Sequence, residues 1–276
     1  MYHNPAETHI SSRARARLAA VLQAAKDLVT IDDTVAALGI DRTAAAKTLA
    51  RWQRQGWLKR VGHGLYAPVP LDALSAQQVL KDPWVLVPPL FSPCYVGGWT
   101  AAEHWDFTEQ LFRSIFVVTA RPVRTTELTV QGIPFTLART RQEVIFGTQT
   151  LWRDHTQVAI SDRHRTILDM LSDPACGGGV RHVESCLRCY LHGAEADTDT
   201  LIRYAERLDN GAVFKRLGFL VSQMPGQEKL AEACRARLTQ GNTKLDPGLP
   251  CRRLVRAWRL WIPRNWTQGE DRDRQA

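Results

Sequence analysis

Cationic side chains recur at helical spacing in the first quarter of the chain. Lys47, Arg51 and Arg54 are four and three residues apart, so a helix would place them in one stripe along one face. Like charges at this spacing repel one another unless an anion faces them, and DNA phosphates and guanine edges supply such a partner. We therefore predict contact with double-stranded DNA, with a solvated basic face as the alternative. The predicted DNA-binding residues are Arg42, Thr43, Lys47, Arg51, Arg54, Lys59, Arg60 and His63.

A second set of residues has the side-chain types of a metal-dependent nuclease. Asp162 and Asp169 also have structural interpretations, because Asp162 can cap a helix and Asp169 can pair with Arg163 or Arg165. We favour the structural interpretation and predict no catalytic residue, no enzyme activity and no cofactor. A nuclease or nucleotide transferase fused to a DNA-binding head is the alternative. The set comprises Asp154, His155, Asp162, His164 and Asp169.

Thiols and an imidazole gather around residue 186. Cys186 and Cys189, with His182 and Cys176 upstream, could ligate zinc. The two thiols lie within one predicted amphipathic helix, and no second clear ligand pair accompanies them. We therefore predict structural thiols on a buried face and no metal.

Two glycine-containing segments invite a functional interpretation. Gly177–Gly179 precede a predicted helix and could cradle a phosphate. No Lys-Ser/Thr pair follows them and no strong strand precedes them, so we predict a loop and a helix start. Lys215–Gly218 is predicted to be a structural turn of helix with a charged rim, in which Arg216 is able to hold a carboxylate.

Arginine and tryptophan alternate near the end of the chain. In a short helix, Leu254, Trp258 and Trp261 would share one face, and arginines would share another. Such a pattern suits nucleic acid or an acidic partner. Docking of the tryptophan face onto the domain, with the arginines in solvent, is equally consistent with the sequence. The arginines are Arg252, Arg256 and Arg259.

The elements that would position the first stripe form a winged helix-turn-helix over residues 1–70. Three helices are predicted, with Thr30 or Asp32 capping the second, Gly39 ending it and Asp41 capping the third. A hairpin that turns around Gly62-His63-Gly64 then supplies the wing, so the third helix lies where a recognition helix lies. The predicted helices cover residues 12–28, 33–38 and 42–55.

The sequence after residue 70 predicts an α+β domain over residues 71–265, with a disordered tail over 266–276. A short linking helix over 71–80 comes first, and strand-like segments imply a small antiparallel sheet. From residue 162 the apolar period becomes helical, so the C-terminal half is predicted to be helical. The predicted strands cover 114–119, 127–130, 134–138 and 144–152, and the predicted helices cover 162–171, 180–191, 198–208, 212–224 and 227–238.

Composition sets the class of protein. The chain has 276 residues, a formal charge of +8 and a hydrophobic fraction of 44%, which are typical of a globular protein. No apolar run reaches the roughly 20 residues that cross a bilayer, and no signal peptide is apparent, so we expect a cytoplasmic protein with reduced thiols. Positive charge is concentrated at both ends of the chain, which suggests polyanion contact there.

Four segments carry a resemblance to one family. They are GWLKRVGHGLYAP, YVGGWTAAEHWDFTEQ, VAISDRHRTILDMLSDPACGGG and LDNGAVFKRLGFLVSQ, and with their surroundings they span most of residues 30–224. In this order they resemble segments of the AbiEi-type antitoxins of type IV toxin–antitoxin (abortive infection) systems. Trp99 and Trp105 stand where that family's second motif has commoner residues.

The resemblance implies a transcriptional autorepressor that binds inverted repeats in its own promoter. It also implies an antitoxin that neutralises a cognate nucleotidyltransferase-type toxin encoded beside it, in defence against phage. In that family the winged helix carries DNA binding, and the C-terminal domain carries antitoxicity. A winged-helix regulator with a ligand-sensing domain, outside toxin–antitoxin biology, is the further alternative.

Overall fold

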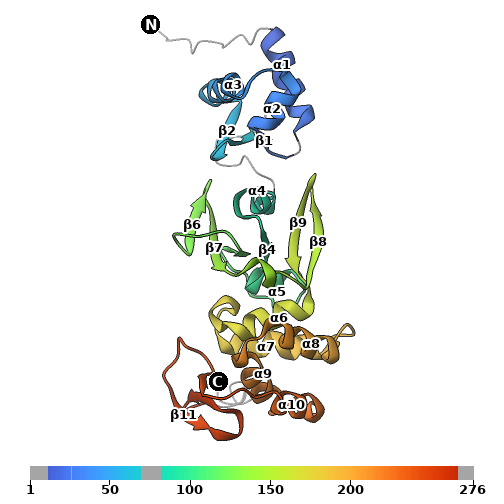
Figure 1. Cartoon of the computed structure of the whole chain (residues 1–276), viewed down its shortest axis with the longest axis vertical. Helices are drawn as coiled ribbons and strands as arrows, with labels where there is room; N and C mark the ends of the chain where they lie inside the picture. The colour runs from blue at the N-terminus through green and yellow to red at the C-terminus, as the bar shows by residue number, and fades with distance from the viewer. Residues whose placement is uncertain (1–11, 26, 70–81, 267–276) are drawn as a thin grey trace. The chain divides into compact units, whose positions relative to one another are not determined.

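The computed structural model describes residues 12–25, 27–69 and 82–266 (Figure 1). The described residues divide into two compact units. The first contains the residues up to Leu90 together with two short segments, Thr129–Ile133 and Trp152–Gln157. The second contains Phe91–Leu128, Pro134–Leu151 and the residues from Val158 onward. The predicted linking helix over 71–80 and the predicted tail beyond Trp266 lie outside the described residues.

Three helices and three strands open the first unit. Thr30 caps the second helix through a reciprocal capping box with Asp33, and Gly39 ends it with a φ of 62°. Asp41 caps the third helix by accepting from the Ala44 amide at 2.9 Å. These predicted caps are confirmed. The elements are α1 (Ser12–Ala24), β1 (Val29–Thr30), α2 (Ile31–Leu38), α3 (Arg42–Arg54), β2 (Leu58–Gly62) and β3 (Leu65–Pro68).

The first helix and the strand after it differ from the sequence prediction. Helix α1 ends at Ala24 rather than near residue 28, because Val29 and Thr30 leave the helix to pair with Tyr66 and Leu65 of β3. The resulting sheet has the order β1-β3-β2. Two residues are too short a run for periodicity to reveal as a strand, so β1 becomes visible only through its partner.

The predicted hairpin is present, with a tighter turn than the three residues expected. Strand β2 runs through Gly62 and β3 begins at Leu65, which leaves His63 and Gly64 at the turn. Gly64 has a φ of 67°, a conformation that favours glycine. The pairing register shifts between Arg60 and Gly62, a bulge that twists the hairpin.

The central sheet corrects the prediction of a small antiparallel sheet. It has six strands in the order β6-β7-β5-β4-β9-β8 and is mixed, since β5 pairs parallel with β7 and β4 pairs parallel with β9. Alternating apolar residues predict strands without stating which strands pair or in which direction. Strands β4 and β9 were not predicted. The strands are β4 (Cys94–Val96), β5 (Ile115–Thr119), β6 (Glu127–Val130), β7 (Ile133–Arg139), β8 (Thr148–Arg153) and β9 (Thr156–Ser161).

Helices dominate the chain after β9, as the sequence predicts, and the fold is mixed α and β. Their apolar faces share one core, in which Ile167, Leu187, Leu201 and Leu217 are fully buried. The helices are α6 (Arg163–Ser172), α7 (Val180–His192), α8 (Thr198–Leu208), α9 (Gly211–Val221) and α10 (Glu228–Arg235). Shorter helical segments are η1 (Pro83–Leu86), α4 (Val87–Phe91), α5 (Gly98–His104), η2 (Gln142–Val144) and η3 (Pro174–Gly177). None of the described helices is long and apolar enough to cross a membrane.

The arginine- and tryptophan-rich segment is a small sheet, so the predicted helix is wrong. Along its last strand the exposure alternates, because Leu260 and Ile262 are buried and Trp261 is exposed. This is the period of a strand rather than of a helix. Arg259 adopts a φ of 50° and turns the chain back. The sheet has the order β10-β12-β11 and comprises β10 (Thr243–Lys244), β11 (Cys251–Val255) and β12 (Leu260–Pro263), with η4 (Arg256–Trp258) between the last two.

Residues 215–218 of α9 fix this C-terminal sheet in place. Arg216 is buried and donates to the carbonyl oxygens of Leu171 and Ser172, both at 2.7 Å, and of Lys244 at 3.0–3.1 Å. It therefore binds carbonyls rather than the predicted carboxylate, because the C-terminal end of α6 presents free carbonyl oxygens. Any side chain at Gly218 would overlap the buried Trp258 ring.

Candidate nucleic-acid interface

Helix α3 has one buried face and one cationic face. Ala45 and Leu49 are fully buried and Trp52 is almost so, as the sequence predicts, and they join the small core of the first unit. Lys47, Arg51 and Arg54 are exposed on another face. The apolar stripe orients the helix on the module, which leaves the cations directed to solvent.

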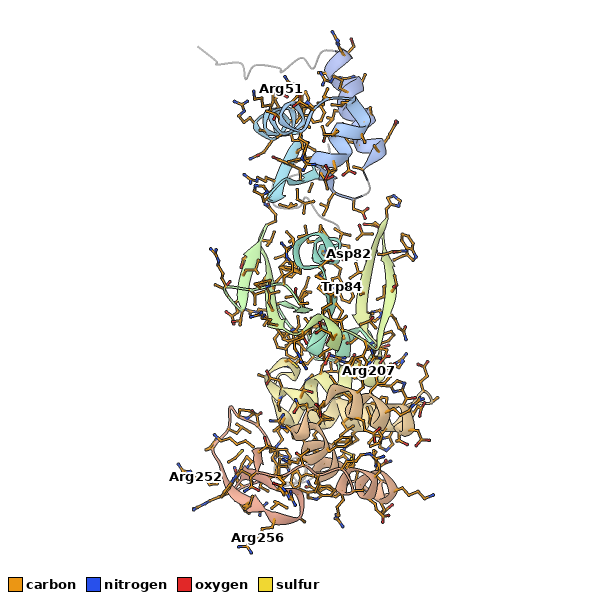
Figure 2. All side chains as sticks on the ribbon, in the orientation of Figure 1. Arg51, Asp82, Trp84, Arg207, Arg252 and Arg256 are labelled. Carbon is orange, nitrogen blue, oxygen red and sulfur yellow. The ribbon has the colours of Figure 1, made fainter. Side chains whose placement is uncertain are left out.

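The three cations of this stripe have no hydrogen bond or ion pair from their side chains within the described part of the chain. Figure 2 labels Arg51 on α3. At the leading end of the helix, Thr43 is exposed, and Arg42 forms an ion pair with Asp32 of α2. Both members of that pair are well exposed, so the pair contributes little to stability and leaves Arg42 available to an anion.

The predicted hairpin residues differ in their exposure. Arg60 and His63 are exposed, and Lys59 is half-buried. Arg60 donates from its Nε to the Gly62 carbonyl at 3.1 Å, which folds the side chain back along the hairpin. Strand β2 packs against α3. The structure thus carries all eight predicted residues on α3 and on the hairpin packed against it.

Three of the predicted nuclease residues, Asp162, His164 and Asp169, lie in the second unit and have structural contacts. Asp162 caps α6 by accepting from the Arg165 amide at 2.7 Å, and its second oxygen accepts from the Tyr204 hydroxyl at 3.1 Å. His164 shares a hydrogen bond of 2.7 Å with the Tyr190 hydroxyl. No group of three or more metal-ligating side chains occurs among the described residues. Asp154 and His155 lie at the turn between β8 and β9, and both are exposed.

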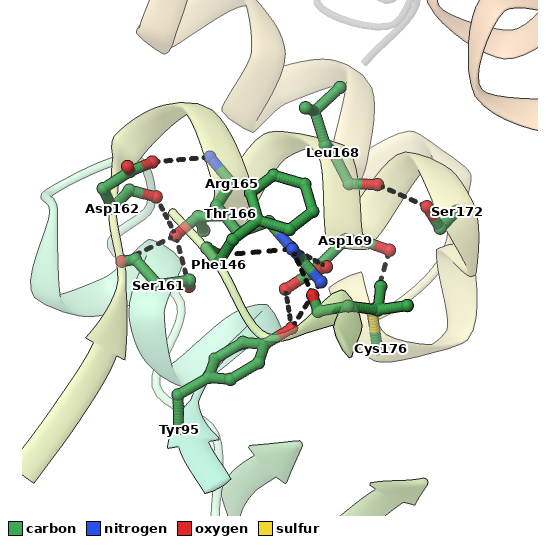
Figure 3. A network of polar contacts seen from close by, with 11 residues as sticks. Tyr95, Phe146, Ser161, Asp162, Arg165, Thr166, Leu168, Asp169, Ser172 and Cys176 are labelled. Carbon is green, nitrogen blue, oxygen red and sulfur yellow. Dashed lines mark hydrogen bonds and ion pairs between the residues drawn. The ribbon is translucent and has the colours of Figure 1, made fainter. Parts of the chain in front are cut away.

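Asp169 pairs with Arg165, one of its two predicted partners (Figure 3). Arg165 donates from Nε to the Asp169 carboxylate at 2.7 Å and from Nη2 to the Tyr95 hydroxyl at 2.9 Å. The Tyr95 hydroxyl donates to the other Asp169 oxygen at 2.9 Å. Burial raises the pKa of the Asp169 carboxyl, while the charge of Arg165 and the two hydrogen bonds oppose this rise.

The other groups of Arg165 in this network are also paired. The remaining Arg165 nitrogen donates to the Val144 and Phe146 carbonyls at 2.9 and 3.2 Å. Tyr95 was not anticipated, because 70 residues separate it from Arg165 and no local pattern joins them. The network borders a cavity of about 890 Å³. The volume falls within the range of small-molecule pockets, although the polar groups of the network bind one another.

The thiols of the second unit fit the structural prediction, with one exception. Cys176 and Cys186 are buried, and burial raises the pKa of the Cys186 thiol to about 12. Such a thiol is a poor metal ligand because the thiolate is the form that binds. Cys189, in contrast, is exposed, so it does not lie on the predicted buried face. His182 bonds to the Gly177 carbonyl and the Thr108 hydroxyl, at 2.6 and 2.7 Å.

The glycine-rich loop before α7 holds a carboxylate of the chain itself. The Val180 amide, the first of α7, donates to the buried Asp246 side chain at 2.9 Å. Gly178 and Gly179 have φ of 74° and 99° and shape the turn. A phosphate would have to displace Asp246, so the loop and helix start predicted from the sequence describe this segment.

Comparison with known proteins identifies the first module. Residues 16–69 match the model of a family described as a transcriptional regulator, AbiEi antitoxin. The N-terminal module is similar to this family over these residues, which make up less than half of the chain. The matched range runs from within α1 to just beyond the end of β3 and includes all eight predicted DNA-binding residues. The family resemblance inferred from the sequence is thereby confirmed for the first of its four segments, and the other three lie outside the matched range.

The other comparisons bear on the fold alone. Among solved structures, the chain is similar to the RV2827C protein from Mycobacterium tuberculosis, with a TM-score of 0.63, 14% sequence identity and 90% of each chain covered. At this identity the similarity shows a shared fold that extends well beyond the AbiEi-type module. No curated protein matches the chain.

The two tryptophans that depart from the AbiEi motif have structural contacts. Trp99 donates from its indole nitrogen to the Ser114 carbonyl at 2.8 Å and stacks on Phe112. Trp105 donates to the Ser161 carbonyl at 2.8 Å, and Arg163 lies over its ring at 4.8 Å. Both tryptophans are partly buried and pack against the core of the second unit.

Proposed function

We propose that this protein is a DNA-binding transcriptional repressor whose first 70 residues act as a winged helix. The observation that carries the proposal is the stripe of Lys47, Arg51 and Arg54 on a helix whose opposite face is buried. The stripe is exposed, and its side chains have no partner in the part of the chain that the structure describes. A helix of this kind enters the major groove, where arginine binds guanine edges and phosphates. Arg42 and Thr43 would contact DNA from the leading turn of α3.

The hairpin would act as the wing. Arg60 and His63 are exposed at or near its turn, and Lys59 lies on its first strand, so these three would contact phosphates or the minor groove. Phosphate contacts position a protein on DNA, and base contacts give it a sequence preference. We therefore assign the wing to positioning and α3 to recognition of an inverted repeat in the protein's own promoter.

We further propose that residues 71–265 act as the antitoxin domain of a type IV toxin–antitoxin system in the cytoplasm. The family match of the N-terminal module supports this assignment, because the matching model describes an antitoxin. The toxin would be a nucleotidyltransferase-type protein encoded by a neighbouring gene. Such a role requires no catalytic residue in this chain.

The DNA-binding part is tested by a mobility shift with the DNA upstream of the protein's own gene. The double variant Lys47→Ala/Arg51→Ala should bind at least tenfold more weakly than the wild type, because each lost phosphate or base contact lowers affinity. A matched control, Arg113→Ala/Arg124→Ala, removes two exposed positive charges from the second unit. Equal binding by the wild type and the α3 variant would show that α3 does not recognise DNA.

The antitoxin part is tested by co-expression with the neighbouring gene. The full chain should restore growth to cells that express a toxic nucleotidyltransferase-like neighbour, and the α3 double variant should still do so when expressed from a foreign promoter. Failure of both chains to restore growth would reject the antitoxin role. It would leave the DNA-binding proposal in place, because the two tests have separate readouts.

A ligand-sensing regulator is the second candidate, favoured by the cavity of about 890 Å³. Apolar residues such as Phe116, Val118 and Leu208 line part of it. The antitoxin proposal remains preferred because Arg165, Asp169 and Tyr95, the buried polar groups at the cavity, are already paired with one another. The nuclease alternative has less support, since Asp162 and Asp169 are held by structural contacts.

A further inference from the structure

The C-terminal sheet carries a concentration of positive charge that differs from the rest of the second unit. Between Pro247 and Trp266 the chain has five arginines and no acidic residue. All five are exposed: Arg252, Arg253, Arg256, Arg259 and Arg264. Protein surfaces ordinarily mix the two signs of charge, so an acid-free run of this kind indicates an anionic partner.

An exposed tryptophan lies on the outer side of the same sheet. Trp261 of β12 is directly opposite Leu254 of β11 and Lys244 of β10, so these three side chains form one row across the strands. Leu260 and Ile262, its neighbours along β12, are fully buried on the other side. The indole is 37% exposed and has no hydrogen bond, ring contact or cation contact within the described part of the chain.

Arg252 and Arg256 lie two residues to either side of Leu254 along the chain, whereas Arg253 is directly opposite Ile262 and so belongs to the other side of the sheet. Arg252 lies where the register between β11 and β12 shifts, and Arg256 lies where the chain turns between these strands. Figure 2 shows both side chains directed away from the ribbon. Neither of them, nor Arg253 or Arg264, has a side-chain hydrogen bond or ion pair in the described residues. Of the five arginines, Arg259 alone donates from its side chain to an acceptor among the described residues, the Thr239 carbonyl at 2.9 Å.

The sheet beneath this surface is firmly held. Trp258 packs over Gly218, and Arg216 binds the Lys244 carbonyl, so both the turn and the first strand are fixed to α9. A surface on a rigid support loses little conformational entropy when it binds. Trp258 is buried and anchors the sheet, whereas Trp261 is exposed on its outer side. The sequence alone left open whether the tryptophans dock onto the domain or face a partner.

We propose that the face around Trp261, with Arg252 and Arg256, binds single-stranded RNA. Phosphates would contact the arginines, and an unpaired base would stack on the indole, as bases stack on aromatic side chains at the surface of a sheet. In a duplex the faces of the bases are covered by their neighbours, so a duplex would contact the arginines and leave Trp261 unused. RNA is chosen because it is the nucleic acid that cells hold mainly in single-stranded form.

The test uses the full chain and the fluorescence anisotropy of a labelled 12-nucleotide RNA of mixed sequence. The variant Arg252→Ala/Arg256→Ala should bind at least tenfold more weakly than the wild type, and Trp261→Ala about tenfold more weakly. Trp261→Phe should recover most of the affinity, because phenylalanine retains a face on which a base stacks. Thermal melting of each variant verifies that the sheet remains folded.

Two controls separate this surface from the winged helix. Lys47→Ala/Arg51→Ala should leave RNA affinity within twofold of the wild type, and the Trp261→Ala variant should retain its affinity for duplex promoter DNA. The inference is overturned if Trp261→Ala binds RNA as the wild type does, or if the α3 variant abolishes RNA binding. It is also overturned if the labelled RNA does not bind while an acidic protein partner does. A single-stranded DNA of the same sequence, bound more tightly than the RNA, would contradict the choice of RNA.

Discussion

Two groups of cations in this molecule have opposite environments. Arg165 and Arg216 of the second unit are buried, and internal oxygens accept from their guanidinium groups. Lys47, Arg51 and Arg54 of the first unit are exposed, and their side chains have no hydrogen-bond or ion-pair partner among the described residues. A buried cation must be paired because desolvation is costly, whereas an exposed cation without a partner needs no structural role. The contrast separates positive charge that holds the fold from positive charge that is free to bind a ligand.

The largest effect expected from this contrast comes from replacing Arg165. Arg165→Ala leaves Asp169 buried without its counter-ion, so the free energy of unfolding should fall by about 3–5 kcal/mol. Urea denaturation followed by circular dichroism measures this change. A loss of less than about 1 kcal/mol would mean that Asp169 readily becomes neutral in the folded state, and the role of Arg165 would then be smaller than its burial indicates.

The packing of the C-terminal sheet on α9 is tested by Gly218→Ala, for which we expect a loss of stability of intermediate size. In Gly218→Ala the new methyl group overlaps the Trp258 ring, so the free energy of unfolding should fall by about 1–3 kcal/mol. Gly226→Ala is not a suitable control, because Gly226 has a φ of 78°. Gly248→Ala is a better control, since its new Cβ would lie 3.3 Å from an Asp246 carboxylate oxygen, which a shift of a few tenths of an ångström relieves, whereas the new Cβ at Gly218 would overlap the Trp258 ring. Equal stabilities of the two alanine variants would contradict the close packing at Gly218.

The exposed cations should contribute almost nothing to stability. Lys47→Ala/Arg51→Ala should change the free energy of unfolding by no more than about 0.5 kcal/mol, because neither side chain has an internal partner to lose. Chemical denaturation of the variant and the wild type in the same buffer measures the difference. A loss as large as that of Arg165→Ala would show that the stripe on α3 holds the module together.

The smallest effect belongs to the ion pair between Arg42 and Asp32. Asp32→Ala frees Arg42 and should alter stability by about 0.5 kcal/mol or less, since both side chains are well exposed. Promoter affinity should rise slightly, because the Arg42 charge is no longer partly neutralised. A fall in affinity would mean that Asp32 orients Arg42 toward DNA rather than competing for it.

Local signals in the sequence predicted the first module well. The caps Thr30 and Asp41, the turn at Gly39, the apolar stripe of α3 and the hairpin were all visible because each depends on neighbours within a few residues. The helices of the C-terminal half were predicted for the same reason. The exposure of the cations on α3 followed from the helical period once Ala45, Leu49 and Trp52 were assigned to the core.

Long-range pairing accounts for what the sequence did not predict. The parallel pairs β5–β7 and β4–β9 depend on strands far apart in the chain, and the contact of Tyr95 with Arg165 joins two different elements. The C-terminal segment was assigned to a helix because Leu254, Trp258 and Trp261 have spacings that a helix also satisfies. The segment forms a sheet because β12 pairs with β10 and because Trp258 packs against Gly218. Both contacts join residues far apart in the chain, so a local pattern does not reveal them.

The central claim is that the stripe on α3 faces the phosphates and bases of duplex DNA. The most direct measurement is the salt dependence of binding between the full chain and its own promoter DNA, followed by fluorescence anisotropy over a range of potassium chloride concentrations. For Lys47→Ala/Arg51→Ala the slope of log K against log salt should be shallower by about 1.8, the value for two lost phosphate contacts. An unchanged slope, with affinity equal to that of the wild type, would contradict the account.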